Sequence, residues 1–237
     1  MAVEPGLIPQ GHKFRMSRQV VQLSFNISEK FYSIQGESSL AGYPCVFFRL
    51  SGCNLRCHYC DARYTYEESG AATSLSNLLE FAGRYPGALV EITGGEPLLQ
   101  ENVYPLMEKL LAAGRRVLLE TNGSINIGRV PREVRKIMDI KCPDSGMSGH
   151  LERANIGLLG PNDEIKFVIS SEKDYFWAAE MVRGPLSQSR VAAIHFSPVI
   201  PDVSPALMAE WLLHDSLPVR LQLQLHKILW PEIKRGA

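Results

Sequence analysis

The sequence has no excess of either charge, no long hydrophobic run and few cysteines. Among 237 residues, 25 Lys and Arg balance 25 Asp and Glu. Because proteins that bind nucleic acid usually carry a basic excess, we expect no nucleic-acid partner. No apolar run approaches the roughly 18 residues that a membrane-spanning helix needs, and Met1–Arg18 lacks the apolar core of a secretory signal. We therefore predict a cytoplasmic protein that does not bind membranes.

The composition is that of a folded globular chain. Hydrophobic residues make up 45% of the sequence and charged residues 21%, close to globular averages. The sequence shows no internal repeat and no low-complexity linker. We predict a single domain over residues 20–237 and an N-terminal extension over residues 1–19, which nothing in the pattern requires to be ordered.

The five cysteines are too few and too unevenly spaced for a disulfide framework. An odd number without a signal segment favours reduced thiols. Cys45 and Cys142 are isolated, so we interpret them as ordinary buried thiols. The other three form one short run, C-x3-C-x2-C, made of Cys53, Cys57 and Cys60. Thiolates this close together can converge on one metal centre.

Two kinds of metal centre are compatible with this run. A structural zinc site needs four ligands and usually draws them from two separated pairs, and His58 is poorly placed to complete the set. An iron–sulfur cluster bound by three cysteines leaves one iron without a protein ligand, and such a vacancy is suited to catalysis. The spacing favours the cluster over zinc.

Strand-like and helix-like stretches alternate along the chain, which predicts parallel strands joined by helical crossovers. We expect strands at residues 46–50, 89–93, 117–120, 137–141, 165–169, 193–196 and 221–225, and helices at residues 75–84, 103–111, 175–182 and 205–213. About six β–α units are too few for a closed eight-stranded barrel. The fold class predicted is therefore α/β, a partial (β/α)6-type barrel with its site at the carboxyl ends of the strands.

Most of the predicted strands have one polar face, although strands of an open α/β sheet are usually apolar on both faces. The polar residues at alternate positions are Arg49, Glu91, Thr93, Glu120, Asn122, Asp139, Lys141, Lys166, His195, Ser197, Gln222, Gln224 and His226. Salt bridges inside a barrel would account for one or two of these charges. Burying all of them without water or a ligand would be costly, so we expect a polar ligand inside the barrel.

The segment Gly94-Gly95-Glu96-Pro97 follows directly on a predicted strand. Glycines at that point let the backbone approach a ligand closely, and the carboxylate beside them can accept bonds from an ammonium group. Taken alone, the segment is also compatible with a simple turn before a helix.

The cysteine run, with Tyr59 before its last cysteine, resembles the signature of the radical S-adenosylmethionine (SAM) superfamily. The resemblance implies a 4Fe-4S cluster on Cys53, Cys57 and Cys60, with SAM chelated on the open iron. It also implies that Gly94, Gly95 and Glu96 grip the ammonium group of SAM, and that Tyr59 and Asp61 lie near its adenosyl part.

Four further segments resemble the 7-carboxy-7-deazaguanine synthases within that superfamily: Phe31–Glu37, Asp61–Tyr66, Glu120–Gly123 and Leu223–Lys227. The resemblance runs from about Phe31 to Trp230. It implies a lyase that contracts the ring of 6-carboxy-5,6,7,8-tetrahydropterin with loss of ammonia, on the route to queuosine and other 7-deazapurines. In that reaction SAM supplies the radical that takes the substrate's C6 hydrogen, and the cofactor is regenerated.

The resemblance also assigns roles to residues. For the substrate it implies Ile34, Gln35 and Gly36 at the pterin edge, Arg49 on the substrate carboxylate, and Thr93. For the cofactor it implies Asp139, Ile140, Lys141, Ser197, Pro198, Val199 and Ile200, by a looser alignment. We add Glu37, Gln224 and His226 to the substrate site from their face and motif. Structural hydrogen bonding is the alternative role for these three residues.

Two positions depart from the family pattern. Relatives often have Thr or Ser two residues after the last cysteine, where the hydroxyl binds a Mg²⁺ ion that bridges to the substrate. This chain has Ala62 there, so Mg²⁺ is either held by water, Asp61 and substrate or dispensable. Some relatives use a terminal carboxylate soon after the His-Lys segment, whereas this chain continues from Pro231 to Ala237.

The resemblance implies a flavodoxin or ferredoxin as electron donor, and an exposed sheet edge would favour a homodimer. Two other functions stay open at this point. One is a small radical SAM activating enzyme that makes a glycyl radical on a partner protein. The other is a non-catalytic iron–sulfur or zinc-binding module.

Overall fold

The computed structural model describes residues 23–233, 235 and 236, so the predicted extension at residues 1–19 lies outside the described part of the chain. The strands are β1 (Ser24–Ile34), β2 (Pro44–Leu50), β3 (Ala71–Ser74), β4 (Leu89–Gly94), β5 (Val117–Thr121), β6 (Arg135–Asp139), β7 (Glu164–Ile169), β8 (Ala193–Pro198) and β9 (Arg220–Leu221).

All nine strands belong to one curved sheet in the order β3-β1-β2-β4-β5-β6-β7-β8-β9. The seven strands from β2 onward, β3 excepted, run parallel, and β1 lies antiparallel between β3 and β2. Within the described residues, β3 and β9 each pair on one side only, so the sheet does not close. The prediction of a partial barrel is confirmed.

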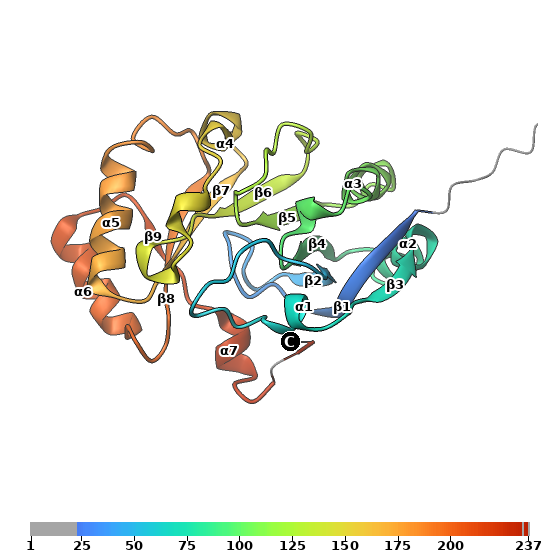
Figure 1. Ribbon diagram of the computed structural model, residues 1–237, viewed down its shortest axis with the longest axis horizontal. Helices are drawn as coiled ribbons and strands as arrows, with labels where there is room; N and C mark the ends of the chain where they lie inside the picture. The colour runs from blue at the N-terminus through green and yellow to red at the C-terminus, as the bar shows by residue number, and fades with distance from the viewer. Residues whose placement is uncertain (1–22, 234, 237) are drawn as a thin grey trace, which may run out of the picture.

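Helices follow most of the parallel strands and cover the outside of the sheet (Figure 1). They are α1 (Tyr64–Glu67), α2 (Leu75–Gly83), α3 (Val103–Ala112), α4 (Ala154–Leu158), α5 (Glu172–Arg183), α6 (Pro205–Asp215) and α7 (Leu225–Leu229), with 3-10 turns η1 (Pro97–Leu99), η2 (Pro143–Ser145) and η3 (Ser148–His150). Serine hydroxyls accept a backbone N–H and start three of them: Ser74 at α2, Ser171 at α5 and Ser204 at α6. No helix in the described residues is long and apolar enough to cross a membrane.

The outer face of the sheet packs against the helices in two cores. One core joins β1, β2, β4 and β5 to α2 and α3, and the other joins β6, β7 and β8 to α5 and α6. Figure 1 shows these helix pairs at opposite ends of the sheet. Alternate residues of each strand contribute to these cores, for example Val46, Phe48 and Leu50 in β2.

The inner face has a small apolar core of its own, made of Cys45, Phe47, Leu89, Leu118 and Ile137. These residues come from the first halves of β2, β4, β5 and β6, so they fill the end of the barrel where the parallel strands begin. We call these five residues the floor of the cavity. The polar residues that follow them on the same strands lie nearer the carboxyl ends.

Two parts of the fold differ from the sequence prediction. Strand β1 is long and lies in the sheet, although the segment around Phe31 was expected to precede the first strand. The predicted strand Leu221–Leu225 is wrong, because only Arg220 and Leu221 pair with β8 and the short helix α7 begins at Leu225. Leu221 is 38% exposed, so the alternating leucines there have no apolar layer to pack against.

Candidate active site

A cavity of about 810 Å³ opens at the carboxyl ends of the parallel strands. Small-molecule sites commonly have such volumes, and this end of the strands is where α/β folds place them. The predicted site residues that line the cavity are Ile34, Gln35, Gly36, Glu37, Arg49, Cys53, Cys57, Tyr59, Cys60, Asp61, Thr93, Gly94, Gly95, Asp139, Lys141, Val199, Ile200, Gln224 and His226.

Four of the predicted cofactor residues lie outside the cavity lining: Glu96, Ile140, Ser197 and Pro198. Ile140 is fully buried in the core against α5 and α6, because it lies between two residues that face the opposite way. Ser197 and Pro198 are buried at the end of β8, and only the residues after them reach the cavity.

The three motif cysteines lie on the loop between β2 and α1 and face one side of the cavity. All three thiols are free and half-buried, and the backbone N–H of Leu55 lies 3.4 Å from the Cys53 sulfur. No three or more His, Cys, Asp or Glu side chains in the described residues are placed to hold a single metal ion. Three thiols on one short loop suit an iron–sulfur cluster that keeps one iron open.

Gly94 and Gly95 allow the end of β4 to lie against the cysteine loop. A Cβ on Gly94, which has φ +151°, would meet the Leu50 carbonyl oxygen at 2.2 Å. A Cβ on Gly95 would meet the Gly52 oxygen at 2.2 Å and the Cys53 Cβ at 2.6 Å. Side chains at these positions would push the cysteine loop away, so the motif fixes the position of Cys53.

Glu96, the next residue after these glycines, connects β4 to the end of β5. Its carboxylate accepts bonds from the Thr121 hydroxyl at 2.9 Å, the Asn122 N–H at 2.7 Å and the Leu98 N–H at 3.0 Å. The side chain is completely buried. In this structure the Glu96 carboxylate therefore connects the turn after β4 to the end of β5, and its contact with an ammonium group stays a prediction.

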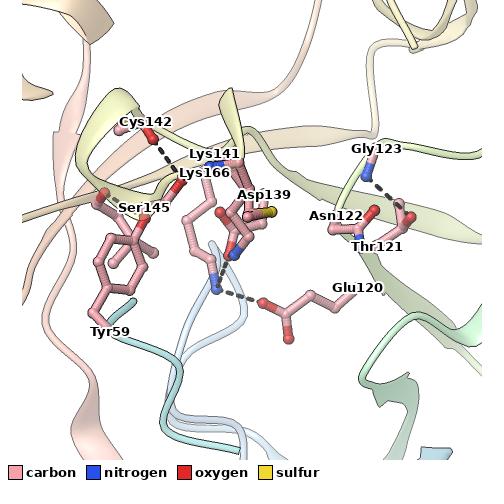
Figure 2. A network of polar contacts seen from close by, with 12 residues as sticks. Tyr59, Glu120, Thr121, Asn122, Gly123, Asp139, Lys141, Cys142, Ser145 and Lys166 are labelled. Atoms are coloured by element: carbon pink, nitrogen blue, oxygen red, sulfur yellow. Dashed lines mark hydrogen bonds and ion pairs between the residues drawn. The ribbon is translucent and has the colours of Figure 1, made fainter. Parts of the chain in front are cut away.

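A network of buried charges crosses the middle of the barrel (Figure 2). The Lys166 ammonium group lies 2.7 Å from Glu37 and 3.5 Å from Asp139, and it also contacts Glu120. Burial alone would lower the pKa of Lys166, but the carboxylates outweigh burial and raise the pKa well above its usual value. Lys166 is therefore charged at neutral pH, and the expectation of an inward-facing polar surface is confirmed.

Two groups in this network retain unused hydrogen-bonding capacity. Asp139 Oδ2 is 2.8 Å from Lys141, whereas its buried Oδ1 has no partner in the described chain. Arg49 binds Glu29 through Nε at 2.7 Å, and its terminal nitrogens bond to no described residue. An orphaned acceptor beside the cysteine loop and a free guanidinium edge fit a cofactor with an ammonium or hydroxyl group and an anionic substrate.

Glu91 is a carboxyl group in the apolar floor. Phe47 and Leu118 are its neighbours on the adjacent strands, and Gln35 Nε2 donates a hydrogen bond to it. Burial, followed by the nearby Glu120 charge, raises the pKa of Glu91 to about 8. The floor of the cavity therefore presents a carboxylic acid that is neutral at pH 7.

His195 does not join the site, although its strand alternation predicted an inward polar face. Its Nε2 lies 2.7 Å from the Glu164 carboxylate, and both side chains are buried. Neither residue lines the cavity, although His195 is opposite Lys166 in the register of β7 and β8 and so shares its face of the sheet. The two side chains satisfy each other through this buried hydrogen bond, and Glu164 also accepts the Ser39 N–H at 2.9 Å.

The start of α7 completes the cavity on the open side of the barrel. Gln224 donates to Glu37 at 2.7 Å, and the Leu225 N–H donates to the Gly36 oxygen at 3.0 Å. A Cβ on Gly36 would meet the His226 ring at 2.4 Å, so Gly36 is what allows the imidazole so close. Burial lowers the pKa of His226, which keeps the ring neutral at pH 7.

Comparison with known proteins agrees with this geometry. Residues 49–201 match the family model of the Radical SAM superfamily. The chain is 45% identical over 222 residues to the 7-carboxy-7-deazaguanine synthase of Koribacter versatilis, which covers 88% of this chain and 98% of the relative. It is 46% identical over 215 residues to the synthase of Chlorobaculum tepidum, which covers 90% of this chain and 97% of that one.

The chain belongs to the 7-carboxy-7-deazaguanine synthase family of the radical SAM superfamily. The crystal structure of QueE from Escherichia coli has a similar fold, with a TM-score of 0.69 and 25% identity over 85% of this chain and 94% of that one. Membership of this family implies a SAM-dependent lyase that carries a 4Fe-4S cluster. Family membership therefore argues against both alternatives from the sequence, the glycyl-radical activating enzyme and the non-catalytic module.

The residues present do not form a Mg²⁺ site in this member of the family. Ala62 offers only a methyl group, and Asp61 Oδ2 is 2.9 Å from the Lys227 ammonium group. A lysine ammonium group at that distance repels a second cation from the same carboxylate. Of the two alternatives that the sequence left open, the geometry does not support the one in which Asp61 helps to hold Mg²⁺.

Sequence reasoning missed several residues of this family member's site. Glu29 binds Arg49, but alternation in β1 would not have shown this, because Phe25 and Ile27 pack in the outer core and the register of β1 shifts between Ile27 and Glu29. Tyr64, Ile233 and Arg235 line the cavity as well, but no pattern in the sequence connects the last two residues with the cysteine loop.

We expect Gly95→Ala to lose the cluster, because the added Cβ would collide with Gly52 and Cys53 on the loop that carries the thiols. Iron and sulfide per chain after anaerobic reconstitution measure the effect. Gly87→Ala is the matched control, since a Cβ there has nothing within 4 Å. A Gly95→Ala protein with full iron and sulfide content would contradict the prediction that Gly95 is needed to position the cysteine loop.

We expect the free energy of unfolding to fall as the pH rises from about 5 to about 8, through the proton on Glu91. The pKa of this carboxyl is raised from 4.5 to about 8 by burial, so in that range the folded chain holds a proton that the unfolded chain has lost. Glu91→Gln should remove this part of the dependence and gain stability relative to wild type as the pH rises.

Anaerobic urea unfolding across that pH range measures the difference between wild type and Glu91→Gln. Glu108→Gln, at an exposed position on α3, is the control and should follow wild type at each pH. Parallel stability curves for wild type and Glu91→Gln would show that Glu91 does not titrate there.

Proposed function

We propose that this chain catalyses the conversion of 6-carboxy-5,6,7,8-tetrahydropterin to 7-carboxy-7-deazaguanine with loss of ammonia. The names of its relatives support the product, since the synthases of Koribacter versatilis and Chlorobaculum tepidum are each named for it. The observation that carries the proposal is Arg49. Its free guanidinium edge faces a cavity that also contains the cysteine loop, as a small anionic heterocycle requires.

The cluster and SAM supply the radical that starts the reaction, and the protein binds, orients and shields the reactants. On the cofactor side, Gly94 and Gly95 bring the backbone of β4 against the cysteine loop, and the unpaired Asp139 Oδ1 would accept a hydrogen bond from bound SAM. The Tyr59 ring is fixed by the bond from its hydroxyl to the Val168 oxygen at 3.2 Å. In this position the ring would contact the adenine of bound SAM.

On the substrate side, Arg49 binds the carboxylate through its two terminal nitrogens, because Glu29 occupies Nε. Glu91, neutral at pH 7, and Gln35 face the pterin from the floor of the cavity. Neutral His226 can donate one hydrogen bond and accept another. Glu37 and Gln224 bond to each other and hold α7 against the end of β1. Ile34 and Thr93 complete the lining around the ring.

We propose further that a flavodoxin or ferredoxin reduces the cluster.

We also propose that two copies of the chain form a homodimer. Exposed apolar side chains support the dimer. Tyr32 and Ile233 are 44% and 50% exposed and line a second pocket with Trp230, and Ile228 and Leu229 of α7 are also exposed. Together they form an apolar surface near one end of the sheet.

An anaerobic assay of the reconstituted protein with the pterin, SAM and a reductant tests the proposed reaction. We expect 7-carboxy-7-deazaguanine to form, and to form at the same rate with and without added Mg²⁺, because the Lys227 ammonium group stands beside Asp61. SAM cleavage without this product would reject the substrate. A rate that depends on Mg²⁺ would show that the cation binds without a hydroxyl at position 62.

Substitution of Arg49 tests the carboxylate contact. We expect Arg49→Lys to raise the KM for the pterin about 10- to 100-fold, because lysine keeps the positive charge but cannot form the bidentate hydrogen bonds of arginine with the substrate carboxylate. Arg84→Ala is the control, because Arg84 is exposed beyond α2 and pairs only with Glu80. Cluster content is measured in each variant. An unchanged KM with a full cluster would remove Arg49 from the substrate-binding role.

A further inference from the structure

The C-terminal segment after α7 forms one wall of the cavity. Trp230, Pro231, Ile233, Arg235 and Gly236 all line it. Figure 1 shows α7 at the edge of the molecule below β2 and α1, and residues 235 and 236 extend back toward α1. The segment therefore crosses the side of the barrel that the sheet leaves open between β9 and β1.

Arg235 fastens the far end of this segment to the residues that follow the cysteine loop. Its guanidinium carbon lies 4.1 Å from the centre of the Tyr64 ring. Its two terminal nitrogens bind the two carboxylate oxygens of Glu68, one of them at 3.1 Å. Arginine is the only side chain that can stack on an aromatic ring and form a bidentate ion pair with a carboxylate at the same time.

The same tyrosine connects Arg235 to the substrate-binding arginine. The Tyr64 hydroxyl donates to Glu29 Oε1 at 2.5 Å, and this oxygen also accepts a bond from Arg49 Nε at 2.7 Å. A shift of the Tyr64 ring would therefore disturb the carboxylate that orients the Arg49 guanidinium. Arg235 covers the face of that ring and limits such a shift.

We propose that Arg235 is a positioning residue, which holds the described C-terminal residues, 230–233, 235 and 236, across the cavity and fixes Arg49 through Tyr64 and Glu29. The proposal rests on the proposed function, since it assigns Arg49 to the substrate carboxylate. An exposed ion pair adds little to global stability. The effect of the latch is therefore on ligand affinity and on the local motion of the segment.

The chain contains a matched control for this arrangement. Arg129 lies 4.1 Å over the Tyr104 ring and pairs with Glu101 at 2.9 Å, the same two contacts that Arg235 makes. Neither Arg129 nor Tyr104 lines the cavity. Arg129→Ala therefore removes an equivalent surface arginine without touching the site.

The test uses the full-length reconstituted holoenzyme without reductant, so that ligand binds but does not turn over. The dissociation constant is measured for the carboxylated tetrahydropterin and for tetrahydropterin that lacks the 6-carboxylate. We expect Arg235→Ala to weaken binding of the carboxylated pterin about three- to tenfold and binding of the uncarboxylated one less. Arg235→Lys and Glu68→Gln should give smaller losses in the same direction, and Arg129→Ala none.

Amide hydrogen exchange measured by mass spectrometry gives a readout that does not depend on the pterin. The bonds from Trp230 N–H to His226 and from Ile233 N–H to Trp230 should open more often in Arg235→Ala, so the segment exchanges faster than in wild type or Arg129→Ala. Unchanged exchange, or equal losses for the two pterins, would overturn the proposal. A wild-type enzyme that binds the pterin but forms no product would instead reject the proposed function.

Discussion

The buried ammonium group of Lys166 and the carboxylates around it are the interaction on which the rest of the site depends. Glu37, Glu120 and Asp139 come from the end of β1, from β5 and from β6, and they meet the lysine of β7 inside the barrel. Charges in a low-dielectric interior are stable only when they are paired and hydrogen-bonded. The network therefore both fixes these strands relative to one another and keeps the barrel interior polar.

The cavity is layered along the barrel axis, because each strand presents alternate residues to the inside. An apolar floor that includes Phe47, Leu118 and Ile137 closes one end, and it holds Glu91 as a neutral acid. The charge network forms the middle layer. The cysteine loop lies beyond it, held against β4 by the two glycines. A radical reaction needs such an order, with the reactive centre on one side and a water-excluding floor on the other.

The open side of the sheet is closed by chain that is not part of the sheet. Helix α7 bonds to Gly36 and Glu37, Lys227 pairs with Asp61, and the segment beyond it reaches Glu68. These contacts link the C-terminal part of the chain to both the substrate side and the cofactor side. The Lys227 ammonium group also pairs with the Asp61 carboxylate beside Ala62, so α7 contributes to the charge next to the cysteine loop.

The sequence by itself determined the parallel-strand architecture, the cysteine run and the inward-facing charges, because the spacing of thiols and the two-residue period of a strand are local properties. Tertiary structure decided the rest. The sequence predicted a strand at Leu221–Leu225, but only Arg220 and Leu221 pair with β8, which ends at Pro198, and the chain turns into α7. Glu96 and Ile140 lie outside the cavity lining and His195 pairs with Glu164, because burial and partner choice depend on distant segments. The closing wall from Trp230 to Gly236 could not be predicted, because its contacts join residues more than 160 positions apart in the chain.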